Sequence, residues 1–192
     1  MATTNLLQVY GTQLLFADHA TDFGAAPATV AHSLIIGAPT DVQMNLSTIA
    51  AAAGWESAKT ATLADVGSAF PIEWVLGACM ESTATPAAGG TFDFFWNPSP
   101  SATAGTGTSG GATGVDASYA VAGKAQLSYI GSMVVRANVI NISADIGRLT
   151  LPYLYGSLVV INSTSVAMQA DDDADNSHIV LTPVIPQSQA AV

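Results

Sequence analysis

Short apolar runs separated by turn residues are the main pattern along this chain of 192 residues. Val42, Met44 and Leu46 alternate with polar neighbours, which is the two-residue period of a strand with one solvated face. A longer apolar run covers 70–80, and another covers 92–96. The same signals predict further strands over 30–36, 128–142, 157–161 and 177–184.

Helical signals are weak by comparison. Residues 48–53 have high helix propensity, but Gly54 follows them, so one or two turns at most are expected there. No segment sustains the period of 3.6 residues. Many short strands with turns between them predict an all-β fold, a β-sandwich or jelly roll, in a single domain over 1–192. The aromatic residues expected to anchor its core are Trp74, Phe94 and Trp96.

Residues 97–118 form the clearest predicted loop, because Pro, Gly, Ser and Thr dominate the segment. Such residues bury too little apolar surface to offset the entropy of ordering them. A loop of this length is usually functional or mobile, and the residues leave both interpretations open. In an assembly, it would become ordered by lying across a neighbouring subunit. The two ends of the chain, 1–12 and 183–192, are predicted to be contact arms.

Charged residues make up only 9% of the chain, with four bases against 14 acids and a net charge of −10. Phosphate contacts depend on Lys and Arg, so nucleic-acid binding is not expected. An anionic membrane would repel the chain, and no apolar run has the length of a membrane helix. The first residues lack the pattern of a signal peptide, so synthesis in a cytoplasm is expected. A surface this poor in charge predicts packing against other subunits in a homo-oligomer.

An acidic run carries the one candidate metal site. Asp171, Asp173 and Asp175 occupy alternate positions, as in the opening of a calcium-binding loop. Asn176 and Thr182 then stand where that loop requires Gly and Glu, so the motif is incomplete. The prediction is a solvated acidic turn without a cofactor, and weak calcium binding between subunits is the alternative.

Candidate catalytic groups are few, and no enzymatic activity is expected. A glycosidase would place two carboxylates across a groove, and Glu73 and Asp93 are the nearest candidates. Both are expected to point outward from their strands instead. Cys79 is the single cysteine and is predicted to be a small buried residue. Three isolated histidines lack the spacing of metal ligands: His19, His32 and His178.

Residues 91–106 and 151–163, completed by 179–184, resemble small structural proteins in the virions of tailed bacteriophages. The resemblance covers the C-terminal half, from Phe92 onward, and consists of strand-and-turn patterns. It implies a β-sandwich located in the virion, either a cement protein that decorates a capsid or a subunit of a tail appendage. Such proteins are commonly trimers or higher oligomers that contact other virion proteins, such as the major capsid or tail proteins. No functional residue carries over.

A carbohydrate-binding module involved in host recognition is the alternative function. A β-sandwich would suit this function equally well. It requires an exposed aromatic platform on which a sugar ring stacks, and the candidates are Trp55, Tyr153 and Tyr155.

Overall fold

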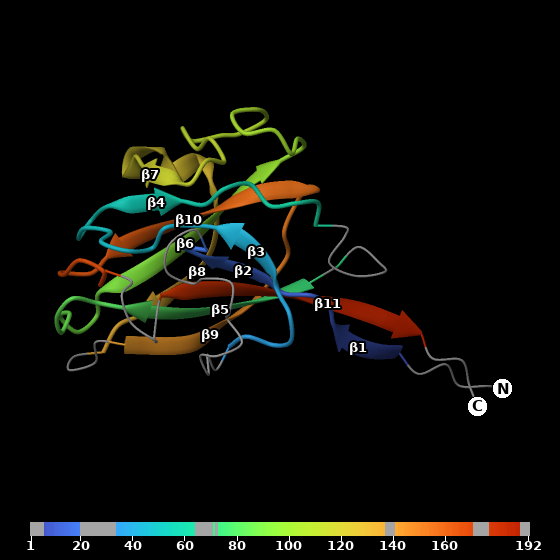
Figure 1. Ribbon diagram of the computed structural model, residues 1–192, viewed down its shortest axis with the longest axis horizontal. Helices are drawn as coiled ribbons and strands as arrows, with labels where there is room; N and C mark the ends of the chain where they lie inside the picture. The colour runs from blue at the N-terminus through green and yellow to red at the C-terminus, as the bar shows by residue number, and fades with distance from the viewer. Residues whose placement is uncertain are drawn as a thin grey trace.

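The protein is a sandwich of two β-sheets, as the apolar pattern predicts (Figure 1). The computed structural model describes residues 6–19, 34–63, 71, 73–136, 141–170 and 177–188. One sheet has six strands: β3 (Thr40–Gln43), β2 (Leu14–Ala17), β11 (His178–Ser188), β5 (Glu73–Glu81) and β9 (Asn141–Leu149) in this order, with β1 (Leu6–Tyr10) also paired to β11. The other has five: β7 (Ala117–Tyr119), β4 (Gly54–Glu56), β10 (Tyr155–Ser163), β6 (Thr91–Ser99) and β8 (Ser128–Val134).

The main core fills the space between the two sheets. Alternate residues of each strand point into it, because side chains on a strand alternate between the two faces. Trp74 of β5 and Phe94 and Trp96 of β6 are fully buried in it, which confirms all three predicted core anchors. Burial also alternates through Val42, Met44 and Leu46, as predicted, although β3 ends at Gln43.

A second apolar layer covers the outer face of the five-stranded sheet. Phe95 and Val159 point outward from β6 and β10, and they pack against Tyr119 and Leu127. A 3₁₀ helix, η2 (Val121–Gln126), lies in this covering segment. Residues 110–127 therefore fold back on the sheet of their own chain.

Several predicted elements differ from those observed. Residues 34–36 are not a strand, and the rest of the predicted strand at 30–33 lies outside the described residues. Residues 48–53 form turns rather than helix, with Thr48 and Ala52 at φ values of 57° and 60°. The predicted strand at 128–142 is two strands, β8 and β9. The predicted loop at 97–118 is shorter, because its first residues continue β6 and its last two begin β7.

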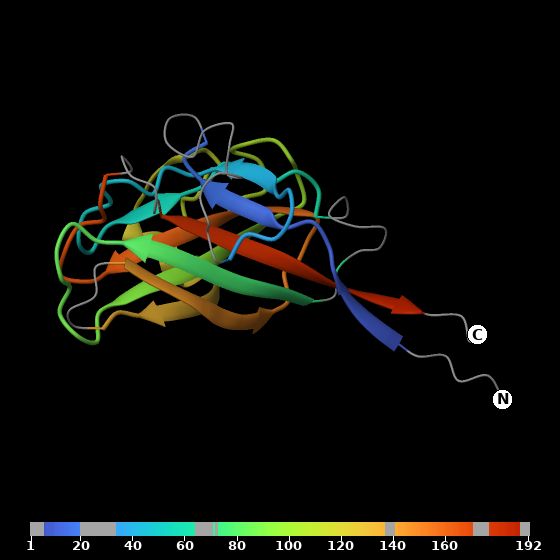
Figure 2. The same ribbon diagram turned by 60° about the horizontal axis from the view of Figure 1, so that its bottom comes forward.

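A two-stranded ribbon projects from one end of the sandwich (Figures 1 and 2). It consists of β1 and the end of β11, in antiparallel register from Tyr10↔Val184 to Leu6↔Ser188, and it is called the terminal ribbon below. β1 and β2 follow the same edge of β11 with a break between them. At this break the Gly11 N–H donates to the carbonyl of Pro183 over 2.9 Å. Pro183 has no N–H of its own, so an interrupted ladder suits it.

Candidate interaction surfaces

The two acids considered for catalysis do not share a site. Glu73 is next to the inward-pointing Trp74, so it faces outward from the six-stranded sheet, where it pairs with Arg148 over 3.2 Å. Asp93 faces outward from the five-stranded sheet, between the inward-pointing Phe92 and Phe94. The two carboxylates therefore lie on opposite outer faces of the sandwich, as the sequence predicts.

Asp93 is held by hydroxyl groups of neighbouring strands. Its carboxylate accepts hydrogen bonds from Ser132 Oγ at 2.5 Å and from Ser163 Oγ at 2.8 Å. Partial burial acts to raise the pKa of Asp93, but these hydrogen bonds outweigh it, so the pKa lies below its ordinary value. This environment favours a carboxylate that stays ionised rather than one that exchanges protons near neutral pH.

The three aromatic residues considered for sugar stacking do not form one platform. Trp55 is paired with Val160 of β10, and its indole N–H donates to Asp116 over 2.6 Å. Tyr155 begins β10, five residues away, which is about 17 Å along a strand at roughly 3.3 Å per residue. Tyr153 is 59% exposed and adopts a φ of 68° in the preceding turn.

The predicted metal ligands Asp171, Asp173 and Asp175 lie outside the described residues, as does His32. Within the described part of the chain, no group of three or more His, Cys, Asp or Glu side chains is placed to hold a metal ion. His19 lies 3.6 Å from Asp41 across a partly exposed ion pair. No helix among the described residues is long and apolar enough to cross a membrane.

A buried carboxylate fixes the loop that follows β6. Glu56 on β4 is only 3% exposed. It accepts backbone N–H bonds from Thr113 and Gly114, each 2.7 Å long, and the hydroxyl of Ser157 at 2.6 Å. Hydrogen bonds to charged groups are about twice as strong as neutral ones. One end of the loop is therefore attached to its own sheet.

An ammonium group organises the other end of the same loop. Lys59 Nζ lies within hydrogen-bonding distance of four oxygen atoms, and burial acts to lower its pKa while the carboxylate of Glu56 acts to raise it. The net pKa of Lys59 is below its ordinary value. These contacts order the loop within its own chain, whereas the sequence led us to expect that a neighbouring subunit would order it. The acceptors are Ser99 Oγ and the carbonyls of Ser101, Thr103 and Thr106.

The terminal ribbon is a candidate surface of a different kind. β1 pairs only with β11 among the described strands, so its outer edge has free backbone groups. β11 pairs with β5 only as far as Val184, so no described strand pairs with its end on that side. Val9 and Tyr10 of β1 are 37% and 57% exposed. Such open edges are ready templates for pairing with another chain.

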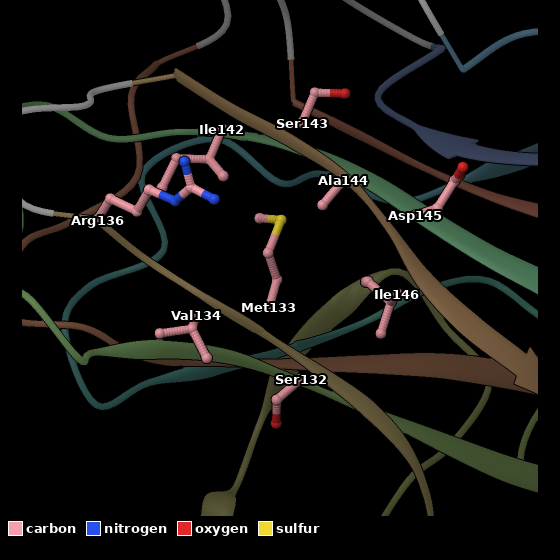
Figure 3. Close-up of a pocket in the computed structure, with 9 residues that line it drawn as sticks. All are labelled: Ser132, Met133, Val134, Arg136, Ile142, Ser143, Ala144, Asp145 and Ile146. Carbon is pink, nitrogen blue, oxygen red and sulfur yellow. The ribbon is translucent and has the colours of Figure 1, made fainter.

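A cleft of about 380 Å³ opens between β8 and β9, the edge strands of the two sheets (Figure 3). Met133 lies between the two strands, and Arg136 stands at one side of the opening. We call this cleft the edge cleft. It is lined by Ser132, Met133, Val134, Arg136, Ile142, Ser143, Ala144, Asp145 and Ile146.

The sequence alone does not reveal the edge cleft or the contacts of Glu56 and Lys59. The contacts of Glu56 and Lys59 join residues that are 40 or more positions apart in the chain. The cleft lies between consecutive strands, β8 and β9, but it exists because these strands belong to different sheets. Alternation in 142–146 is the one available signal, because Ile142, Ala144 and Ile146 share a face. No protein-family model, curated protein or solved structure matches this chain.

Proposed function

We propose that this protein is a structural subunit of a tailed-phage virion, a cement protein or part of a tail appendage, that acts by packing against copies of itself and other virion proteins. The terminal ribbon is the observation that carries the proposal. A two-stranded ribbon is marginally stable by itself in water. This one projects from the body, with exposed apolar residues and strand edges that pair with no other described strand. These features favour a segment that is stabilised by contacts with another subunit.

Charge distribution supports the same proposal. The chain carries a net charge of −10, so two copies repel each other at long range. Residues 6–10 and 184–188 contain no charged side chain, and among the described residues they project from one end of the body. Contact through this segment brings two acidic copies together with little local repulsion.

The loop after β6 supports a role in contacts with other virion proteins. Glu56 and Lys59 fix it against its own sheet before any partner binds. A preformed loop loses less conformational entropy on binding than a mobile one. We therefore assign this loop to the outer, partner-facing surface.

The self-association is tested by the mass of the full chain in solution, measured by light scattering with and without EDTA. A trimer or larger oligomer is expected in both conditions. Val9→Asp in β1 should shift the mass toward the monomer, because it places a charge on the exposed ribbon. The matched control is Ser118→Asp, an exposed position on β7. A wild-type monomer at all concentrations would contradict the proposal.

The virion assignment needs a separate measurement. Mass spectrometry of density-purified phage particles is expected to detect the chain at a defined copy number. Its presence only in the soluble fraction of the lysate would contradict this assignment even if the chain forms oligomers.

A further inference from the structure

The five-stranded sheet leaves part of the other sheet uncovered at the edge cleft. Ile142, Ala144 and Ile146 of β9 share the face that packs against the main core. Each is only half-buried, whereas the corresponding residues of the neighbouring strand β5 are fully buried. The difference arises because β8 is the last strand of its sheet. One further strand paired to the free edge of β8 would lie over these residues of β9.

The two edge strands meet at one end of the cleft. A Cβ atom on Gly131 would lie 2.6 Å from Cγ2 of Ile146, so β8 and β9 are in close contact there. Both strands also have a register shift beside this contact. The shift in β8 lies opposite Phe94 and Phe95 of β6, and the shift in β9 lies opposite Leu76 and Gly77 of β5. Such bulges bend a strand locally, and both lie beside the contact of Gly131 with Ile146. Beyond this contact, at the end of β8, Val134 is 60% exposed.

We infer that the edge cleft receives the terminal ribbon of a second copy of this chain, with the outer edge of β1 pairing along β8. This inference rests on the proposed function, because it names the surface through which the copies pack. β1 supplies backbone groups for the open edge of β8, and apolar side chains of the ribbon cover the exposed residues of β9. Residues 6–10 and 184–188 carry no charged side chain, so the ribbon brings no ion of its own into the cleft.

The ribbon of the same chain does not supply this strand. It leaves the sandwich at one end, while β8 ends and β9 begins at the opposite end (Figure 2). The contact therefore joins different surfaces of the two copies, head to tail. Such a contact closes into a ring or continues as a filament, unlike the symmetric contact of a two-fold dimer.

Charge placed on the cleft provides the first test. Val134→Glu changes an exposed residue of β8, so the isolated chain is expected to fold as before. Burial of the new carboxylate against the ribbon should raise the dissociation constant of the oligomer roughly tenfold or more. The matched control is Ser118→Glu on β7, the opposite edge of the same sheet, which should leave the constant unchanged. Sedimentation velocity measures both.

A disulfide between two separately prepared variants provides the second test. Val9→Cys and Val134→Cys are made in a Cys79→Ser background, mixed and mildly oxidised. A covalent dimer containing one chain of each variant is expected. Val9→Cys mixed with Ser118→Cys should give none, because β7 is remote from the cleft. Circular dichroism checks that all variants are folded.

The outcomes separate this inference from the proposed function. Loss of oligomer in Val134→Glu together with the mixed disulfide supports the inference. A wild-type oligomer that is unaffected by Val134→Glu and gives no mixed disulfide overturns the inference and leaves the proposed function standing. A wild-type chain that stays monomeric overturns both.

Discussion

At the scale of single residues, the buried carboxylate of Glu56 makes contacts whose loss should lower the free energy of unfolding. Its two carboxylate oxygens face the backbone N–H groups of Gly114 and Thr113. Glu56→Gln turns an amide NH₂ toward one of these donors, which leaves a buried N–H without an acceptor. We expect the free energy of unfolding to fall by about 1–3 kcal/mol.

Urea denaturation measures this change, and Glu73→Gln is the matched control. Glu73 forms an ion pair on the surface, with both side chains about half exposed. Exposed pairs contribute roughly 0–1 kcal/mol, so the control should change little. Equal effects of the two substitutions would contradict the role assigned to Glu56.

Asp93 makes stability depend on pH. Its pKa is lower in the folded protein than in the unfolded chain, because hydroxyl groups bind the ionised form. The stabilisation is therefore complete above the unfolded pKa of about 3.9 and is lost as the pH falls through the folded pKa. Asp93→Asn removes this contribution. The difference in unfolding free energy between the wild type and Asp93→Asn should shrink between neutral pH and about pH 3. A constant difference would show that the hydroxyl contacts do not favour the ionised carboxylate.

At this scale, the sequence predicts the burial of apolar residues better than the contacts of polar ones. Trp74, Phe94 and Trp96 are recognisable as core residues because apolar runs of β-rich sequence surround them. Glu56 and Lys59 give no comparable signal. Their partners lie tens of residues away, and only the folded sheet brings them together. A buried charge paired over such a separation has no local pattern.

At the scale of elements, the contact between β8 and β9 controls the shape of the edge cleft. Gly131→Ala should destabilise the fold by about 1–3 kcal/mol, the usual range for overpacking, because its Cβ meets Ile146. Ile146→Ala removes the obstructing atoms. The double variant should therefore lose less stability than the sum of the two single changes. Urea denaturation of all four proteins measures this coupling, and strict additivity would contradict the contact.

Strands that carry an apolar run were predicted, whereas β9, with nine residues, has no such run and only its first two residues fall in a predicted strand. β5, β6, β10 and β11 each have nine or more residues, and an apolar run marks each of them. Four strands of three to five residues were missed, because so few positions do not establish a period: β1, β2, β4 and β7. The alternation that begins at Val42 marks β3 in part. The strand predicted over 128–142 covers β8 and the start of β9, since no Gly or Pro stands between Val134 and Asn141 to indicate a boundary.

At the scale of the whole molecule, association should strengthen as salt is added. Copies with a net charge of −10 repel each other, and the proposed contact uses an uncharged ribbon. Raising the ionic strength from about 0.01 M to 0.5 M shortens the Debye length from about 30 Å to less than 10 Å and screens this repulsion. Sedimentation at both salt concentrations should show a lower dissociation constant at the higher one. Salt-induced dissociation would instead indicate an interface built from ion pairs.

The place of β11 in the six-stranded sheet also sets the point in synthesis at which the terminal ribbon can form. β11 is the last strand in chain order, yet it lies between β2 and β5 and also holds β1. While the ribosome is still making residues 178–188, neither that sheet nor the projecting strand pair exists. Because these contacts join the two ends of the sequence, they are slow to form compared with local ones. Assembly through the terminal ribbon, as proposed above, therefore begins only after translation of each copy has passed β11.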